Sequence, residues 1–136
     1  KGLESAIGAF GKVKILEPKL KLDPDSLELN LEAAGLYEAL GRARGAADAL
    51  KRAAGRTDDA KAHAKLLVRV LGQLYTVETD EALNVEILAV AAELEKRDAA
   101  QRGEALAARA QVAMNRTIVT AQSGWSRWDL RNPSGW

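Results

Sequence analysis

The stretch LEAAGLYEALGRARGAADALKRA, residues 31–53, decides the fold of this chain. Its apolar residues recur at the three- and four-residue spacing of a helix face, first in one stripe and then in a second. Gly41 and Gly45 bracket a tight turn where the first stripe stops. This stretch and the residues on either side of it therefore predict two packed helices. Their stripes lie at Leu29, Ala33, Leu36 and Leu40 and then at Ala46, Leu50 and Ala53, and the second helix ends near Gly55.

The composition favours the same all-α class for the whole chain. Of the 136 residues, 26 are Ala and 19 are Leu, which are strong helix formers, whereas Val, Ile and Thr together number 17. The chain has three prolines, and none lies between Pro24 and Pro133. This balance argues against a sandwich, a barrel or an alternating βα fold, and the length suits one domain.

Before this stretch, the sequence predicts one more helix and a connector. The helix covers residues 2–17, with an expected core face at Leu3, Ile7, Phe10 and Val13, and it is expected to stop at Pro18. After the connector, Asp25 is expected to be the N-cap of the next helix, with Glu28 closing a capping box.

After this stretch, acidic residues mark the expected start of each later helix, where they suit the helix dipole. One helix is expected from Asp58–Asp59, one after a turn over residues 76–80, and one from Asp98 that frays near Thr120. The expected core faces are Leu67, Val70, Leu71 and Leu74, then Leu83, Ile87, Val90 and Leu94, and finally Leu106, Ala110 and Ala113.

Residues 72–91 repeat residues 34–53 at an interval of 38. The matched positions are Ala34 and Gly72, Tyr37 and Tyr75, Leu50 and Leu88, and Ala53 and Ala91. The opening of the chain supplies the second half of the same unit, with Ala6, Phe10, Val13 and Pro18. This pattern resembles the tetratricopeptide repeat, in which a small residue and a Tyr precede a turn, and an Ala, an aromatic, a second Ala and a closing Pro follow it.

The resemblance implies a fold and a domain plan. It implies an α-solenoid of helical hairpins over residues 1–122, followed by a Trp-rich tail at residues 123–136. The solenoid would hold a half repeat at 2–18, repeats at about 26–56 and 59–96, and a capping helix at 98–120. Three features depart from the family: Asn84 stands where a small Ala is expected, Lys96 stands where Pro is expected, and the interval exceeds the usual length of about 34 residues.

In the tetratricopeptide family, ligands usually lie in the concave groove formed by the first helix of each repeat. Carried onto the two matching units, the groove would hold Glu28, Leu31, Glu32, Gly35, Glu38, Leu66, Arg69, Val70, Gln73 and Thr76. Three glutamates beside apolar residues would suit a peptide with basic and apolar side chains. The alternative is that Glu28, Glu32 and Glu38 form a plain solvated face.

The chain has few residues that could bind a metal ion or take part in catalysis. The chain has no Cys and one histidine, His63, so it cannot assemble a metal site from nitrogen and sulfur ligands. His63 is expected on a solvated surface beside Lys61 and Lys65. No carboxylate is singled out to orient it for acid–base catalysis, and residues 8–13 (GAFGKV) lack P-loop spacing. The chain is therefore expected not to be an enzyme and to need no cofactor.

Charge and hydropathy also narrow the expected partners. The net charge is +1, and no apolar run approaches the length of a membrane span, so neither nucleic acid nor membrane is an expected partner. The absence of Cys does not fix the compartment. The cytoplasm is expected, with the periplasm left open.

The end of the chain differs in composition from the body, because all three Trp lie in SGWSRWDLRNPSGW, residues 123–136. Trp is a frequent interface anchor, and three exposed Trp would invite aggregation. This tail could fold back and seal the last hairpin, or dock into the groove of a neighbouring copy. It could also bind another protein or be an appended segment. Its expected docking residues are Trp125, Trp128, Leu130 and Trp136.

These observations predict a protein–protein interaction module, a scaffold, adaptor or assembly factor, whose groove binds a protein or peptide. Two alternatives belong to other classes. The chain could be a structural module that forms homo-oligomers through its tail. It could also be a non-catalytic regulatory domain of a larger protein. The tetratricopeptide resemblance itself implies that residues 2–17 are the second helix of a hairpin whose first helix is expected upstream.

Overall fold

A computed structural model describes the backbone of residues 2–131 and the side chains of residues 7–118. Across that backbone the chain forms α-helices, one short 3₁₀-helix and no strand, which confirms the all-helical prediction. The elements are α1 (Gly2–Leu22), α2 (Leu27–Ala39), α3 (Ala43–Gly55), α4 (Ala60–Leu74), α5 (Glu81–Arg97), η1 (Ala99–Gln101) and α6 (Arg102–Arg131).

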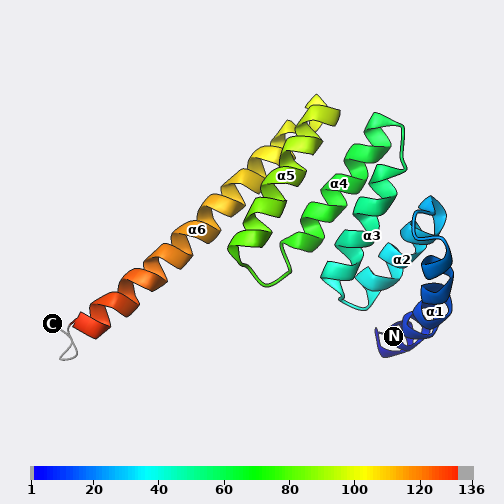
Figure 1. The fold of residues 1–136 in the computed structure, drawn as a ribbon, viewed down its shortest axis with the longest axis horizontal. Helices are drawn as coiled ribbons and strands as arrows, with labels where there is room; N and C mark the ends of the chain where they lie inside the picture. The colour runs from blue at the N-terminus through cyan, green and yellow to red at the C-terminus, as the bar shows by residue number, and fades with distance from the viewer. Residues whose placement is uncertain (1, 132–136) are drawn as a thin grey trace.

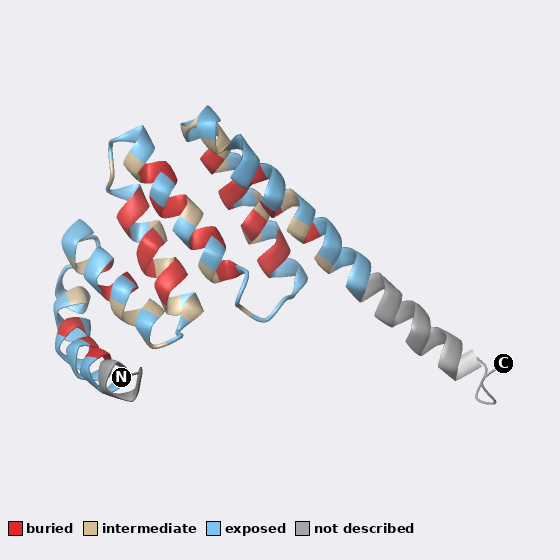
Figure 2. Cartoon of the chain, turned by 180° about the vertical axis from the view of Figure 1, so that it is seen from behind, coloured by how far each residue is buried: buried red, intermediate tan, exposed pale blue. Residues whose placement is uncertain are grey.

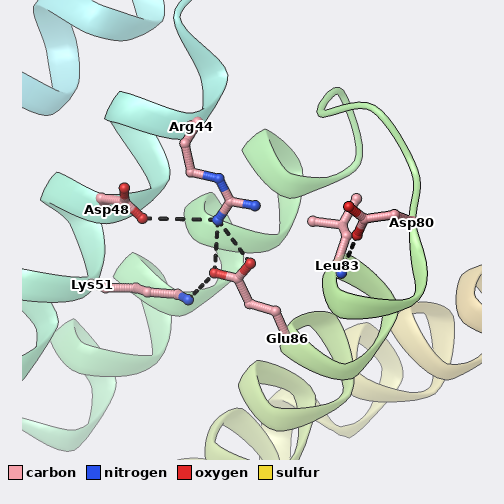
Figure 3. Close-up of polar contacts among 6 residues, drawn as sticks. All are labelled: Arg44, Asp48, Lys51, Asp80, Leu83 and Glu86. Atoms are coloured by element: carbon pink, nitrogen blue, oxygen red, sulfur yellow. Dashed lines mark hydrogen bonds and ion pairs between the residues drawn. The ribbon is translucent and has the colours of Figure 1, made fainter.

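Each α-helix packs on the next one along the chain, so the helices form a row from α1 to α6 (Figure 1). Polar contacts also link helices that are two apart in the row. Glu38 of α2 accepts hydrogen bonds from α4, and Glu86 of α5 accepts hydrogen bonds from Arg44 and Lys51 of α3 (Figure 3). Helices α2 and α4 therefore meet on one side of the row, which we call the even-numbered side, and helices α3 and α5 meet on the other, which we call the odd-numbered side.

The core lies in the middle of the row, where buried residues concentrate in α3, α4 and α5 (Figure 2). The stripes predicted for these three helices are all buried, which confirms their predicted faces. Burying a Leu or Ile side chain contributes roughly 2 kcal/mol, so the large buried side chains hold the row together. The largest fully buried apolar side chains are Leu50, Val70, Leu71, Leu74, Ile87, Leu94 and Val112.

The junction of α1 and α2 differs from the prediction in two ways. Helix α1 does not stop at Pro18 but continues to Leu22, because Leu20 beyond the proline still packs against the core. The chain leaves the helix only before Pro24, and the residue before a proline disfavours helical geometry. The N-cap of α2 is Ser26 rather than Asp25, since the Ser26 hydroxyl accepts the Leu29 N–H at 3.3 Å.

The turn between α2 and α3 forms as its glycine predicts. Gly41 adopts a φ of 71°, a left-handed conformation that a glycine takes without strain. The Gly41 N–H donates to the Glu38 carbonyl at 3.1 Å and the Arg42 N–H donates to the Tyr37 carbonyl at 2.9 Å. This pair of bonds is the Schellman motif that ends helices.

Later helices begin where their acidic residues predict. The carboxylates of Asp59, Asp80 and Asp98 accept backbone N–H groups two or three residues further on, at 2.9, 2.7 and 3.0 Å. Within the part of the chain that the structure describes, no helix combines the length and apolar character needed to cross a lipid bilayer.

The predicted core face of α6 is wrong, whereas that of α1 is confirmed at Val13 and wrong at Ile7 and Phe10, and Leu3 lies outside the residues whose side chains the structure describes. In α1 the buried residues are Ala9, Val13 and Leu16, while Ile7 and Phe10 are exposed. In α6 the buried residues are Ala105, Ala108 and Val112, while Leu106, Ala110 and Ala113 are exposed. The helix also does not end near Thr120 but continues to Arg131. Both helices carry apolar residues on two sides, and only one side meets a neighbouring helix.

Candidate protein-binding face

The predicted groove residues of α2 and α4 meet at one cluster of polar side chains. The half-buried Glu38 carboxylate of α2 accepts hydrogen bonds from the Arg69 guanidinium and, at 3.2 Å, from the Gln73 amide of α4. The side chains of Arg69 and Glu38 are 42% and 28% exposed, so the ion pair is in contact with water. It joins α2 to α4 on the even-numbered side of the row. We call this side the even face.

The α2 half of the even face is acidic. Glu28, Leu31, Glu32 and Gly35 are all exposed on the side of α2 away from the core. Glu28 and Glu32 are one helical turn apart and have neither a hydrogen bond nor an ion pair within the described part of the chain. Their carboxylates are therefore free to contact a ligand, with the half-exposed Leu31 beside them.

The α4 half of the even face differs from the predicted set. Arg69 and Thr76 are exposed and Gln73 is half-buried, and the Thr76 hydroxyl donates to the Gln73 carbonyl at 2.8 Å. Leu66 and Val70, however, are 9% and 0% exposed and belong to the core. A ligand on this face would not reach these two side chains.

Sequence analysis missed the residues that do line the α4 half. Lys61, Lys65 and Gly72 are exposed, and together with Arg69 they follow the spacing of one helix face. That spacing was a signal available in the sequence. The even face thus places an acidic strip on α2 next to a basic strip on α4.

His63 does not lie on the surface as predicted; it is 6% exposed. The position is covered because α4 packs between α3 and α5. Its ring Nδ1 lies 2.7 Å from the Ala54 carbonyl, which can only accept, so Nδ1 carries the proton. Its Nε2 lies 3.5 Å from Glu93 of α5 and has no hydrogen-bond partner. His63 therefore sits at the junction of three helices, away from the even face.

The odd-numbered side of the row carries a small cavity of about 330 Å³, lined by Glu17, Leu20, Lys21, Pro24, Tyr37 and Arg52. The Tyr37 hydroxyl donates to Glu17 at 3.3 Å, and burial followed by the Glu17 charge raises the pKa of Tyr37. Arg52 donates from Nε to Asn30 at 2.8 Å. Among the described residues, no group of three or more His, Asp or Glu side chains is placed to hold a metal ion.

The predicted tail residues lie at the edge of what the structure describes. Trp125, Trp128 and Leu130 fall within helix α6, but their side chains lie outside the described residues. Trp136 lies outside them altogether. No family of known proteins, no curated protein and no solved structure gives a significant match to this chain.

Proposed function

We propose that this chain is a protein-interaction module of tetratricopeptide-like hairpins, and that its even face binds a peptide carrying basic and apolar side chains. The observation that carries the proposal is the contact of Glu38 with Arg69 and Gln73, which aligns the exposed strips of α2 and α4. A peptide lying across both helices would meet Glu28 and Glu32 on one side. Its apolar side chains would contact Leu31 and the methylene stems of Lys61 and Lys65.

Two features support the tetratricopeptide-like arrangement. The hairpins α2–α3 and α4–α5 both carry the Tyr, Leu and small-residue pattern at an interval of 38. In the first hairpin the turn residue Gly45, which lies outside the repeated positions, allows close packing of the two helices, because a Cβ there would lie 3.3 Å from the Tyr37 ring. These features favour a repeat fold, in which alternate helices line one continuous binding surface.

The test is a fluorescence-anisotropy titration with a labelled peptide of alternating Lys and Leu, and with its Glu and Leu counterpart. We expect the Lys peptide to bind and the Glu peptide to bind far more weakly. Replacing both Glu28 and Glu32 by Gln should weaken binding on the order of tenfold, since two charge contacts are lost. The matched control is Asp58→Asn with Glu78→Gln, which removes two exposed acids outside α2 and α4.

Equal affinity of both double variants for the Lys peptide would reject the even face as the binding site, because the peptide would then respond only to net charge. Binding that is unaffected by salt would also count against it, since exposed charge contacts are screened. Far-UV circular dichroism of the variants establishes that the helices remain folded.

A further inference from the structure

The cavity of about 330 Å³ lies where α1, α2 and α3 come together (Figure 1). The apolar part of its wall consists of Leu20, Pro24 and the ring of Tyr37. The charged part consists of Glu17, Lys21 and Arg52. A cavity of this size that joins an apolar wall to a few charged groups is typical of a site for a small molecule.

The guanidinium of Arg52 is held in one orientation by a buried amide. Its Nε donates to the Oδ1 atom of Asn30 at 2.8 Å, and Asn30 is 0% exposed. The Asn30 side chain is itself fixed, because its amide nitrogen donates to the carbonyls of Pro24 and Ser26 at 2.9 and 2.8 Å. Within the described residues, the two terminal nitrogens of Arg52 have neither a hydrogen bond nor an ion pair. A guanidinium presents a flat fork of donors that matches a carboxylate, so Arg52 is positioned to bind one.

Open space borders the Arg52 guanidinium on a second side as well. Arg52 also lines a neighbouring cavity of about 300 Å³, whose other wall residues are Asp25, Gly55 and Arg56. Arg56 pairs with Asp25 at 3.3 Å, so these two charges offset each other. The terminal nitrogens of Arg52 are therefore accessible to a ligand and do not compete for Asp25.

The larger cavity carries more positive than negative charge. Lys21 has neither a hydrogen bond nor an ion pair among the described side chains, and together with Arg52 it supplies two positive charges. Glu17 supplies one negative charge, and its carboxylate accepts the Tyr37 hydroxyl at 3.3 Å. A singly charged anion would balance the cavity, whereas a doubly charged anion would leave excess negative charge beside Glu17.

We propose that this cavity binds a small organic acid made of one carboxylate and an aromatic or branched apolar body. The carboxylate lies against the Arg52 fork and Lys21. The apolar body packs on Leu20, Pro24 and the Tyr37 ring, and these contacts supply affinity while the charged groups fix the orientation of the ligand. None of the lining residues belongs to the even face, so this inference does not depend on the proposed peptide binding.

The first test is an NMR titration of the isotope-labelled full chain with hydrocinnamate, a phenyl ring joined by a short chain to one carboxylate. We expect saturable binding with a dissociation constant of about 1 mM, as for other ligands of this size. The Nε–H resonance of Arg52 should shift as the site fills. Hydrocinnamide keeps the apolar body and lacks the charge, so it should bind at least about tenfold more weakly.

Three positions on α1 separate a local contact from an effect of net charge. Lys21→Gln should weaken the binding of hydrocinnamate about threefold, since one cation of the cavity is lost. The matched control is Lys19→Gln, which removes an exposed lysine of the same helix outside the cavity and should leave the affinity unchanged. Glu17→Gln should act in the opposite direction and strengthen binding about threefold, because a like charge is removed.

Arg52→Lys tests the fork itself, because it keeps the charge and removes the paired donors. It should weaken binding about tenfold, since an ammonium cannot hold both carboxylate oxygens side by side. Far-UV circular dichroism establishes that this variant keeps its helices. The variants at Lys21 and Glu17 test the site without disturbing the contact between Arg52 and Asn30.

Several outcomes would overturn the proposal. Absence of saturable binding would reject the site, and equal binding of hydrocinnamide would make it a purely apolar cavity. Equal losses in Lys19→Gln and Lys21→Gln would mean that the ligand responds only to net charge. Tighter binding of inorganic phosphate than of hydrocinnamate would assign the site to phosphate groups. Much tighter binding of an acetylated dipeptide ending in Phe would assign it to the carboxyl terminus of a protein rather than to a free acid.

Discussion

The inner helices and the end helices of this row differ in how far their apolar residues are buried. In α4 and α5 every residue of the apolar stripe is buried, because a neighbouring helix covers each flank. In α1 and α6 one flank is covered and apolar residues remain exposed on the other, with Ile15 at 67% and Leu106 at 51%. The difference shows that an apolar stripe is buried only where a neighbouring helix lies against it.

The largest expected effect is on the free energy of unfolding, and it should differ between a leucine of an inner helix and a leucine of an end helix. Leu71→Ala, at a site 1% exposed in α4, should lower the free energy of unfolding by about 3–4 kcal/mol, since it leaves a cavity in the core. Leu106→Ala should change it by less than about 0.5 kcal/mol. Urea unfolding measures both free energies. Similar losses for the two variants would show that α6 is as well covered as α4.

Sequence reasoning identified the buried apolar stripes of α3, α4 and α5, because neighbouring helices cover both flanks of each of these helices. It failed on α6 and on most of α1 because each has two apolar stripes, and periodicity alone does not say which one the chain itself covers. It also placed Leu66 and Val70 on the binding face and His63 in solvent, because those positions depend on α3 and α5 lying on either side of α4. The acidic strip of α2 could be predicted, since Glu28 and Glu32 lie on the face opposite the buried Ala33 and Ala34.

The second prediction compares the loss of stability on replacing Asn30 with that on replacing Asn84, both of which are buried. Asn30 donates to the carbonyls of Pro24 and Ser26, at 2.9 and 2.8 Å, and accepts from Arg52 at 2.8 Å. Asn30→Ala should therefore cost about 2–3 kcal/mol, because the Pro24 carbonyl and the Arg52 guanidinium lose their buried amide partner and the α1–α2 connector loosens.

Asn84 lies nearer the end of the row and is bonded to Glu81 and Asn115, both of which reach water. Asn84→Ala should cost only about 1 kcal/mol, since both partners can be solvated in its absence. Thermal unfolding of the two variants beside the parent chain gives the ranking. The reverse order would mean that the α5–α6 contact, not the α1–α2 connector, depends more on its buried amide.

The third prediction compares an inner ion pair with an outer one. Burial alone would raise the pKa of Glu86, but hydrogen bonds from Lys51 and Arg44 outweigh it and leave the pKa lowered. A lowered pKa stabilises the fold above the unfolded value of about 4.3, and this contribution is lost as the pH falls through the folded value. Glu86→Gln should thus cost about 1–2 kcal/mol at pH 7, and the difference should shrink progressively as the pH falls below about 4.3 (Figure 3).

The outer pair behaves differently because it is solvated. Hydrogen bonds from Arg116 and Asn84 also lower the pKa of Glu81, but this carboxylate is 62% exposed. Glu81→Gln should change the thermal midpoint less than Glu86→Gln at neutral pH, and the effect should shrink in high salt. A pH-independent cost of Glu86→Gln would contradict the ion-pair explanation and assign the loss to packing.

The smallest expected effect concerns two exposed glycines inside helices, Gly72 in α4 and Gly11 in α1. An added Cβ meets nothing within 4 Å at either site, so Gly→Ala should stabilise each helix by about 0.5–1 kcal/mol. Helix α4 is packed between α3 and α5, so Gly72→Ala should raise the stability of the whole row. Helix α1 packs chiefly on α2, so Gly11→Ala should slow hydrogen exchange in α1 and leave that of α4 unchanged. Slower exchange throughout the chain in Gly11→Ala would show that the end helix and the inner helices unfold as one unit.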